Sequence, residues 1–160
     1  MDAILLKIPD IPGQTALKDF EDQIQLLSMS HGVAMQMTGN PSDRERTSGR
    51  PNHQDLTVSK YVDLSSCPLI AACNAGTNLK TITLTIGRND AGKIMPYLIF
   101  TLDNALVSSI SVGAGSGDRP TETLTLNYTK IKWDFTEQKG EMGKKGNNGA
   151  VWDLAANTPA

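Results

Sequence analysis

Two histidines are the side chains in this sequence best suited to acid–base chemistry near neutral pH. His31 is in phase with the alternating apolar residues Met29 and Val33, which predicts a partly buried ring, and His53 lies close to Asp55. A small hydrolase could use either imidazole as a general base. The spacing, however, supplies neither a nucleophile beside a base nor a carboxylate cluster beside a histidine. We therefore expect no catalytic residue, no bound metal and no cofactor.

Two glycine-rich stretches resemble phosphate-binding motifs. Gly87–Lys93 matches most of a P-loop, but Ile94 stands where that loop needs Ser or Thr, and a strand pattern follows instead of a helix. Within this stretch, Asn89–Gly92 predicts the turn of a hairpin. Gly113–Gly117 follows a strand pattern and leads through Pro120 into another, so it lacks the helix N-terminus of a dinucleotide site. Both stretches are predicted to be connections between strands.

The two cysteines, Cys67 and Cys73, lie six residues apart in one short segment. This spacing matches neither a CxxC pair nor a zinc site. We interpret both thiols as core filler on a small helix, since free cysteine is often buried.

Length and charge narrow the class of protein. The 160 residues predict one domain spanning residues 1–160. With 15 Lys plus Arg against 17 Asp plus Glu, the net charge of −2 argues against a nucleic-acid binder and against a polybasic membrane anchor. No stretch approaches the roughly 18 consecutive apolar residues of a membrane span. The acidic, short N-terminal run is not a secretory signal, so we expect the chain in the cytoplasm of the cell that makes it.

Alternation of apolar and polar residues predicts a mainly β protein, with at least six strands. Strand patterns cover residues 4–8, 24–35, 56–62, 82–86, 98–106 and 121–135, and a returning strand is predicted at 151–154. Lys60 interrupts the apolar face of residues 56–62. One helix is indicated, with Ser65 and Ser66 as caps, Pro68 in the first turn and Gly76 at the C-terminal cap. An all-β chain with one helix points to a barrel or a sandwich.

Two of these patterns change phase partway. Apolar residues are even-numbered up to Tyr128 and odd-numbered from Ile131, and a similar change follows Leu26. A slip of one residue sends side chains to the opposite face of a sheet. Either a β-bulge or a strand with two buried faces, one of them against a neighbouring chain, would produce it.

Small residues occupy the even positions after Leu26, namely Ser28, Ser30, Gly32 and Ala34. None of them is charged, so this face permits close approach of another backbone or lines a wet, weakly interacting wall. The threonines at 81–86 and 121–125 form similar faces.

Two polar stretches read as loops. The longer, residues 38–54, contains two prolines, two glycines, Arg44, Arg46 and Arg50, and is the best candidate for a surface excursion. The second, residues 138–149, holds four glycines and three lysines and precedes the last strand.

Several segments taken in order are similar to the haemolysin-coregulated protein (Hcp) family, and the similarity covers nearly the whole chain. They are residues 27–32, 59–63, 68–76, 106–111, 120–122 and 127–133. The resemblance implies a β-barrel of two antiparallel sheets with one short α-helix packed on the side. It also implies a structural subunit of the bacterial type VI secretion tube rather than an enzyme.

Family resemblance further implies partners. The subunit forms homohexameric rings that stack into a hollow tube inside a contractile sheath, capped by the valine-glycine repeat spike protein (VgrG). Contraction expels the tube from the bacterial cytoplasm, to the outside or into a target cell, and the lumen carries small effector proteins. By resemblance, Ser30 is a lumen-facing position, so Ser28 and Ser30 are the candidate effector contacts.

The same resemblance places the excursion against the adjacent ring, where Arg44, Arg46 and Arg50 would pair with acidic groups such as those near Asp10 or Asp118. A merely solvated loop remains the other reading of this segment. The alternative function is a monomeric β-barrel ligand-binding module, although few aromatic residues are available to line an apolar pocket.

Overall fold

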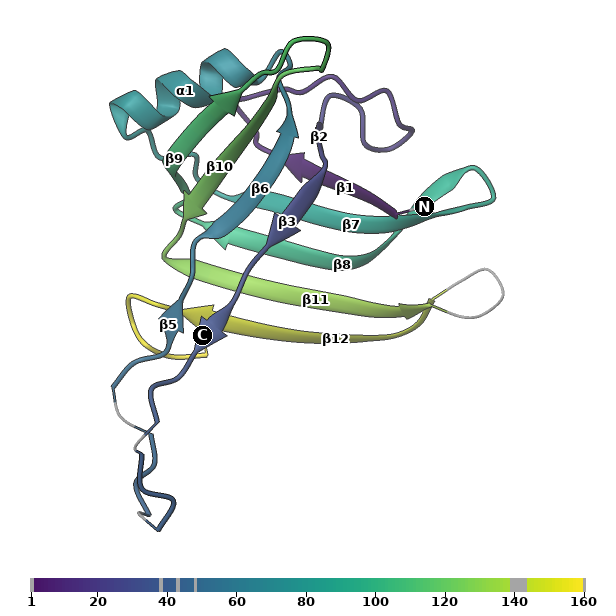
Figure 1. The fold of residues 1–160 in the computed structure, drawn as a ribbon. Helices are drawn as coiled ribbons and strands as arrows, with labels where there is room; N and C mark the ends of the chain where they lie inside the picture. The colour runs from purple at the N-terminus through teal and green to yellow at the C-terminus, as the bar shows by residue number, and fades with distance from the viewer. Residues whose placement is uncertain (1, 38, 43, 48, 139–143, 160) are drawn as a thin grey trace.

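The computed structural model describes residues 2–37, 39–42, 44–47, 49–138 and 144–159. Most of them form antiparallel strands, and one helix accompanies the strands (Figure 1). The largest sheet has six strands in the spatial order β12–β11–β8–β7–β1–β2. Its strands are β1 (Asp2–Lys7), β2 (Ile24–Leu26), β7 (Ile82–Asp90), β8 (Lys93–Asp103), β11 (Lys130–Gln138) and β12 (Lys144–Asp153). The prediction of a mainly β protein is confirmed.

A second sheet has four strands in the order β3–β6–β10–β9, and two further strands, β4 and β5, pair with each other. These strands are β3 (Ser28–Ser30), β4 (Val33–Ala34), β5 (Asn52–His53), β6 (Leu56–Tyr61), β9 (Leu106–Gly113) and β10 (Thr121–Asn127). In the described part of the chain the two larger sheets are separate hydrogen-bonded ladders. They face each other, which gives the barrel-like pair of antiparallel sheets that was expected.

The hydrophobic core lies between these two sheets. Leu84, Leu102 and Ile131 enter it from the six-stranded sheet, and Leu56 and Leu124 enter from the four-stranded sheet. All five side chains are at most 1% exposed. Burial of one such side chain stabilises the fold by about 1.5–3 kcal/mol, so the alternation seen in the sequence is the pattern that holds the sheets together.

Both changes of phase occur where the chain passes from one larger sheet to the other. β10 ends at Asn127 in the four-stranded sheet, and β11 begins at Lys130 in the six-stranded sheet. In the same way β2 and β3 belong to different sheets, and Leu27 between them is 48% exposed. A bulge therefore does not cause either change of phase, whereas burial of a second strand face against a neighbouring chain stays a prediction. The parity of the inward residues changes because the chain turns a corner around one core.

A third crossing divides the predicted strand 98–106. Asn104, with a backbone φ of 53°, lies in the turn between β8 and β9. Leu106 consequently begins a strand of the four-stranded sheet and does not share a strand with Leu102.

The predicted helix is α1 (Ser66–Ala75), which packs beside β9 (Figure 1). Leu69 and Ala72 are its buried apolar residues. Gly76 ends it in the left-handed region at φ 60°, and its backbone N–H donates to the carbonyls of Ala72 and Cys73. The expected C-terminal cap is confirmed, because a residue without a Cβ adopts this φ at little cost.

The stretch Gly87–Lys93 forms a hairpin, as predicted. Ala91 and Gly92 connect β7 to β8 with φ values of 50° and 84°, and two successive positive φ values are typical of a tight hairpin turn. No helix follows, so the stretch lacks the phosphate-binding geometry of a P-loop.

The polar stretch 138–149 was wrongly expected to be a loop throughout. Residues 144–149 belong to β12, which pairs along β11 from Asp153 back to Lys144. Residues 139–143 lie outside the described residues. Backbone pairing with β11 overrides the low strand propensity of the glycines.

The described residues of 35–51, namely 35–37, 39–42, 44–47 and 49–51, belong to a long excursion that projects from the two larger sheets, as Figure 1 shows. At its foot, β4 and β5 pair through Val33 with His53 and Ala34 with Asn52. An isolated bridge between Met37 and Thr47 continues this pairing outward. The predicted surface excursion is confirmed, and it begins a few residues earlier than the sequence indicated.

Candidate functional site

The outward face of the four-stranded sheet carries hydroxyl side chains on every strand. Strand pairing places Ser30, Thr57, Thr125 and Ser109 in one row across the sheet. The next row consists of Ser28, Ser59, Thr123 and Ser111. We call these eight residues the hydroxyl face. Because side chains alternate across a strand, the residues between them, such as Leu56 and Leu124, point into the core.

The hydroxyl face is uncharged. None of its positions on the four strands holds Asp, Glu, Lys, Arg or His. Several hydroxyls bind one another: the Oγ atoms of Ser28 and Ser59 are 2.5 Å apart, and Ser109 Oγ lies 2.6 Å from Thr125 Oγ1. Neutral hydrogen bonds of this kind contribute only about 0.5–1.5 kcal/mol each, so the face offers many weak contacts and no strong one.

Ser28 and Ser30 are exposed on β3, as the sequence predicted for an uncharged small-residue face. The predicted run of small residues does not continue along one strand, however. Gly32 lies after the end of β3, and Ala34 lies in β4, which pairs only with β5. The hydroxyl face instead extends sideways, across strands distant in the sequence.

Lys60 lies on the core side of this same sheet and is fully buried, with 0% exposure. Its Nζ forms an ion pair with Glu122 of β10. It also donates to Asp63 Oδ1 at 2.8 Å and to Ser66 Oγ at 3.2 Å. The sequence interpretation, in which Lys60 interrupts the buried face, was wrong because the lysine stays on that face and finds charged partners inside.

Neighbouring groups complete the network around Lys60. The hydroxyl of Ser66 donates to Glu122 Oε1 at 2.9 Å, and that of Ser65 donates to Asp63 Oδ1 at 2.5 Å. Of the two serines expected to cap α1, Ser65 occupies the N-cap position, but its side chain makes no capping hydrogen bond. Glu122 Oε2 is buried without a partner among the described atoms. The network joins the start of α1 to β6 and β10, and so brings together residues of two segments that carry the Hcp resemblance, 59–63 and 120–122.

Electrostatics favour the charged form of Asp63. Burial by itself would raise the pKa of this carboxyl, but hydrogen bonds from Lys60 and Ser65 and the charge of Lys60 hold the pKa below its ordinary value. A buried charge survives only when it is paired and hydrogen-bonded. The network therefore depends on all of its members.

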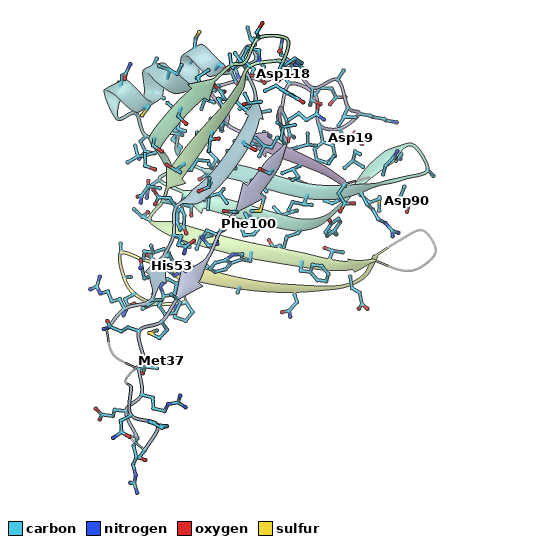
Figure 2. The ribbon with its side chains drawn as sticks, in the orientation of Figure 1. Asp19, Met37, His53, Asp90, Phe100 and Asp118 are labelled. Atoms are coloured by element: carbon cyan, nitrogen blue, oxygen red, sulfur yellow. The ribbon has the colours of Figure 1, made fainter. Side chains whose placement is uncertain are left out.

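Arg44, Arg46 and Arg50 are exposed along the excursion. The acidic groups suggested for them, Asp10 and Asp118, are exposed as well. Figure 2 shows Asp118 at the end of the molecule opposite Met37 on the excursion. One copy of the chain therefore does not bring the arginines and Asp118 together.

Both histidines lie where the excursion leaves the sheets. The predicted partial burial of His31 is confirmed, and its Nε2 lies 2.5 Å from the hydroxyl of Tyr128. The His31 and His53 ring centres are 6.4 Å apart. Aromatic rings surround them: Phe100, Tyr128 and Trp133 pack on His31, and Trp133 stacks on His53. No described contact joins either imidazole to a serine, threonine or cysteine nucleophile.

Other chemistry-bearing residues do not assemble into a site. Cys73 is half-buried against the core, but Cys67 is exposed on α1, so its interpretation as core filler was wrong. Among the described residues no three His, Cys, Asp or Glu side chains lie close enough to hold a metal ion. Within that same part of the chain, no helix has the length and apolar character needed to cross a membrane.

Comparison with known proteins agrees with this geometry. Residues 5–135 match the model of the family described as "Type VI secretion system effector, Hcp". Protein hcp1 of Pseudomonas aeruginosa is 34% identical over 161 residues, which cover 98% of each chain.

Solved structures show the same fold. One described as a type six secretion system protein superposes with a TM-score of 0.93 at 23% identity, over 99% of both chains. Hcp1 from Salmonella typhimurium superposes with a TM-score of 0.80 at 20% identity, again over 99% of both chains. The family match over most of the sequence and the full-length relative together show that this chain belongs to the Hcp family of type VI secretion proteins.

Proposed function

We propose that this chain is the single-domain structural subunit of the type VI secretion inner tube. Six copies form a ring, and rings stack into a hollow tube inside a contractile sheath, capped by VgrG. The tube assembles in the bacterial cytoplasm and is then expelled, to the outside or into a target cell. Membership of a family of secreted, structural proteins rather than enzymes supports this proposal.

The main support for the proposal is the hydroxyl face, which we propose to line the lumen of the tube. A wall that carries cargo and then releases it must hold the cargo weakly. Charged side chains would retain cargo of opposite charge, and apolar ones would bury surface against it. The hydroxyl face does neither, because its eight residues are uncharged and several of its hydroxyls bind one another. Ser28 and Ser30 are the proposed contacts for small effector proteins.

Exposed apolar side chains support self-association. A closed ring needs two different patches that meet head to tail. The exposed large hydrophobic residues in the described part of the chain fall into two groups. One lies near the start of β3 and the end of β6, and the other follows the foot of the excursion and β11. The first is Leu27, Tyr61, Val62, Leu64 and Val112, and the second is Val33, Met35, Met37 and Phe135. Patches of this kind mark contact surfaces.

Ring stacking is proposed to use the excursion. Arg44, Arg46 and Arg50 project away from the sheets, whereas Asp118 lies at the opposite end of the molecule (Figure 2). In a stack of identical copies, the arginines on the excursion of one ring would face Asp118 of the next. The opposite charges of these residues support pairing with groups near Asp10 or Asp118.

Mass in solution tests the assembly. Light scattering after size exclusion should give a particle of six chains, and electron microscopy at high protein concentration should show rings. A particle of one chain, without rings at any concentration, would instead indicate the monomeric β-barrel ligand-binding module.

Cargo binding is tested at Ser30. We expect Ser30→Gln to reduce the accumulation of a small type VI effector produced in the same cells, because the longer side chain covers neighbouring hydroxyls. Thr83→Gln is the matched control, since Thr83 points outward from the other sheet and makes no part of the hydroxyl face. Undiminished effector accumulation in Ser30→Gln, with rings intact, would count against Ser30 as a contact.

A further inference from the structure

Both segments that connect the excursion to the sheets meet in one aromatic cluster. The incoming segment contributes His31, and the outgoing segment contributes His53. The backbone N–H of Gln54 donates to the carbonyl of Gly32 at 2.9 Å, and Val33 pairs with His53. A structural change at this foot therefore changes how the excursion is attached to the sheets.

Tyr128 clamps the foot to the sheets. Its hydroxyl donates to the backbone carbonyl of Gln54 at 2.9 Å. A phenol has one proton to donate, so the contact of 2.5 Å with His31 requires the imidazole Nε2–H to donate to the Tyr128 oxygen. The chain His31 to Tyr128 to Gln54 thus links the incoming segment, the corner between β10 and β11, and the outgoing segment.

The closed foot suits neutral imidazoles. Burial lowers the pKa of His31, and the neighbouring His53 lowers it further. Burial also lowers the pKa of His53. The Nδ1 atom of His53 is buried without a partner among the described atoms, beside an apolar pocket lined by Trp133, Trp152 and Met35. Protonation of either imidazole would therefore place a positive charge among these apolar side chains.

Few charged groups face the cluster to offset that cost. β8 contributes Phe100 and β11 contributes Trp133, neither of which titrates. Tyr128 has a raised pKa and stays neutral. Asp55 acts electrostatically on Tyr128, and its two oxygens already accept hydrogen bonds from Ser108 and Asn127.

We propose that His31 and His53 form an acid-sensitive latch, in which protonation of the two imidazoles loosens the Tyr128–Gln54 clamp and frees the excursion. The direction of the pH effect follows from the coupling between proton binding and opening of the foot. Opening the foot hydrates both rings, so the open state binds protons more readily than the closed state. Opening is therefore favoured as the pH falls through the ordinary histidine value of 6.5. The effect saturates once the pH lies below the closed-state pKa values.

The consequence for assembly rests on the proposed function. If the excursion of one ring docks on the next, mildly acidic conditions weaken stacking while each ring stays folded. The latch is a property of the single chain, however, and is measured without any stacking.

Amide hydrogen exchange on unstacked protein tests the latch directly. Protection factors of residues 33–37 and 49–54 are compared at about pH 7.5 and about pH 5.5, which bracket the ordinary histidine pKa. In the wild type we expect protection at the foot to fall by up to about tenfold for each unit by which a histidine pKa rises on opening. Amides of β7 and β8 should keep their protection.

The matched variant is His31→Gln with His53→Gln. Glutamine keeps an N–H for Tyr128 but takes up no proton in this range, so the loss of protection in acid should disappear. An equal loss in the double variant, or no loss in the wild type, would overturn the latch. If the variant fails to fold, NMR titration of the wild-type imidazoles decides the question, because pKa values at or above 6.5 for both rings would also overturn it. A working latch with pH-independent stacking would contradict only the role of the excursion in stacking.

Discussion

Lys60 is a fully buried charged residue, so its substitution should have a large energetic effect. A fully buried ammonium is tolerable only because Glu122, Asp63 and Ser66 surround it. Replacing a whole buried ion pair by apolar residues is often neutral, whereas removing one partner leaves the other charge unpaired. The network should therefore respond very differently to single and paired substitutions.

We expect Lys60→Met to lower the free energy of unfolding by about 3–5 kcal/mol, because Glu122 would remain buried without its counter-charge. Urea denaturation followed by circular dichroism measures the loss. Lys60→Met combined with Glu122→Leu is the comparison, and it should recover much of the stability. A double variant that is no more stable than Lys60→Met would contradict this account.

Asp63 makes part of this stability dependent on pH. Its pKa is lower in the folded protein than its ordinary value, so its contribution is present above about pH 4 and is lost as the pH falls through the folded pKa. Asp63→Asn should unfold about 1–3 kcal/mol more easily than wild type near neutral pH, and the difference should narrow in acid. Denaturation midpoints from neutral pH to about pH 3 measure it. Asp118→Asn, at an exposed carboxylate, is the control, and a gap for Asp63→Asn that is constant with pH would contradict the prediction.

At this scale the phase of one strand predicted the partial burial of His31, and that prediction succeeded because it needs only local alternation. The small residues Ser28 and Ser30 predicted either a wet wall or close approach of another backbone, and the structure adds that both are exposed in one copy. Burial of Lys60 could not be predicted in the same way, since its partner Glu122 lies 62 positions further along the chain. The sequence did contain an indication of this pair, because Lys60 and Glu122 each occupy an inward position of a predicted strand.

Among the elements, the β7–β8 hairpin shows the closest fit between local sequence and local structure, apart from one residue. Ala91 sits at φ 50°, a left-handed conformation that costs an L-residue with a Cβ roughly 1 kcal/mol. Asparagine tolerates it better and is preferred before glycine in such turns.

Ala91→Asn should therefore raise the free energy of unfolding by about 0.5–1 kcal/mol. Thermal and urea unfolding measure the gain. Ala91→Val is the opposing control and should destabilise, because a β-branched side chain is more strained at positive φ. Equal stability of the Asn and Val variants would show that the turn does not limit the hairpin.

The excursion is the element on which assembly is proposed to depend. Arg46→Glu reverses one charge on it, and surface pairs contribute about 0.2–1 kcal/mol each. Repeated around six copies, the loss is about 1–6 kcal/mol per ring. We expect shorter or absent tubes in electron micrographs, with rings of unchanged mass.

A charge swap distinguishes pairing from a general effect of charge. Asp118→Arg introduced with Arg46→Glu should restore tubes if these two residues meet across rings. If tubes are restored instead by a charge reversal near Asp10, Arg46 pairs with that site and not with Asp118. Tubes of wild-type length in Arg46→Glu would indicate that the excursion is merely solvated.

Helix α1, the hairpin and the excursion were all predictable because each is marked by local residues: a glycine cap, a turn dipeptide and a run of polar residues. The corners between sheets were visible only as changes of phase. A change of phase has the same appearance in sequence for a bulge, a two-faced strand and a crossing between sheets, and only the pairing of distant strands separates them.

At the scale of the whole molecule, the net charge of −2 determines how strongly identical copies repel one another. A strongly charged subunit would repel its neighbours in a stack, whereas a nearly neutral one repels them little. The arginines and Asp118 that are proposed to pair between rings are solvent-exposed, so salt would screen their attraction.

Raising the salt concentration from about 0.05 M to about 0.5 M shortens the Debye length from roughly 14 Å to roughly 4 Å. Tubes should therefore shorten or dissociate into rings, while rings held by apolar patches keep their mass. Sedimentation and electron microscopy at each salt concentration measure both. Rings that fall apart before the tubes do would reverse the assignment of apolar and charged contacts.

Local sequence determined the mainly β class, the position of the helix, a hairpin turn within Asn89–Gly92 and the existence of the excursion, because each depends on the conformational preferences of neighbouring residues. Tertiary structure decided which sheet each strand joins, that eight hydroxyls from four strands form one face, that Lys60 is buried, and that His31 and His53 meet. These features join residues tens of positions apart, and no local preference encodes such a pairing. The Hcp resemblance bridged part of that gap, since the segments that carry it include the residues that the fold brings together.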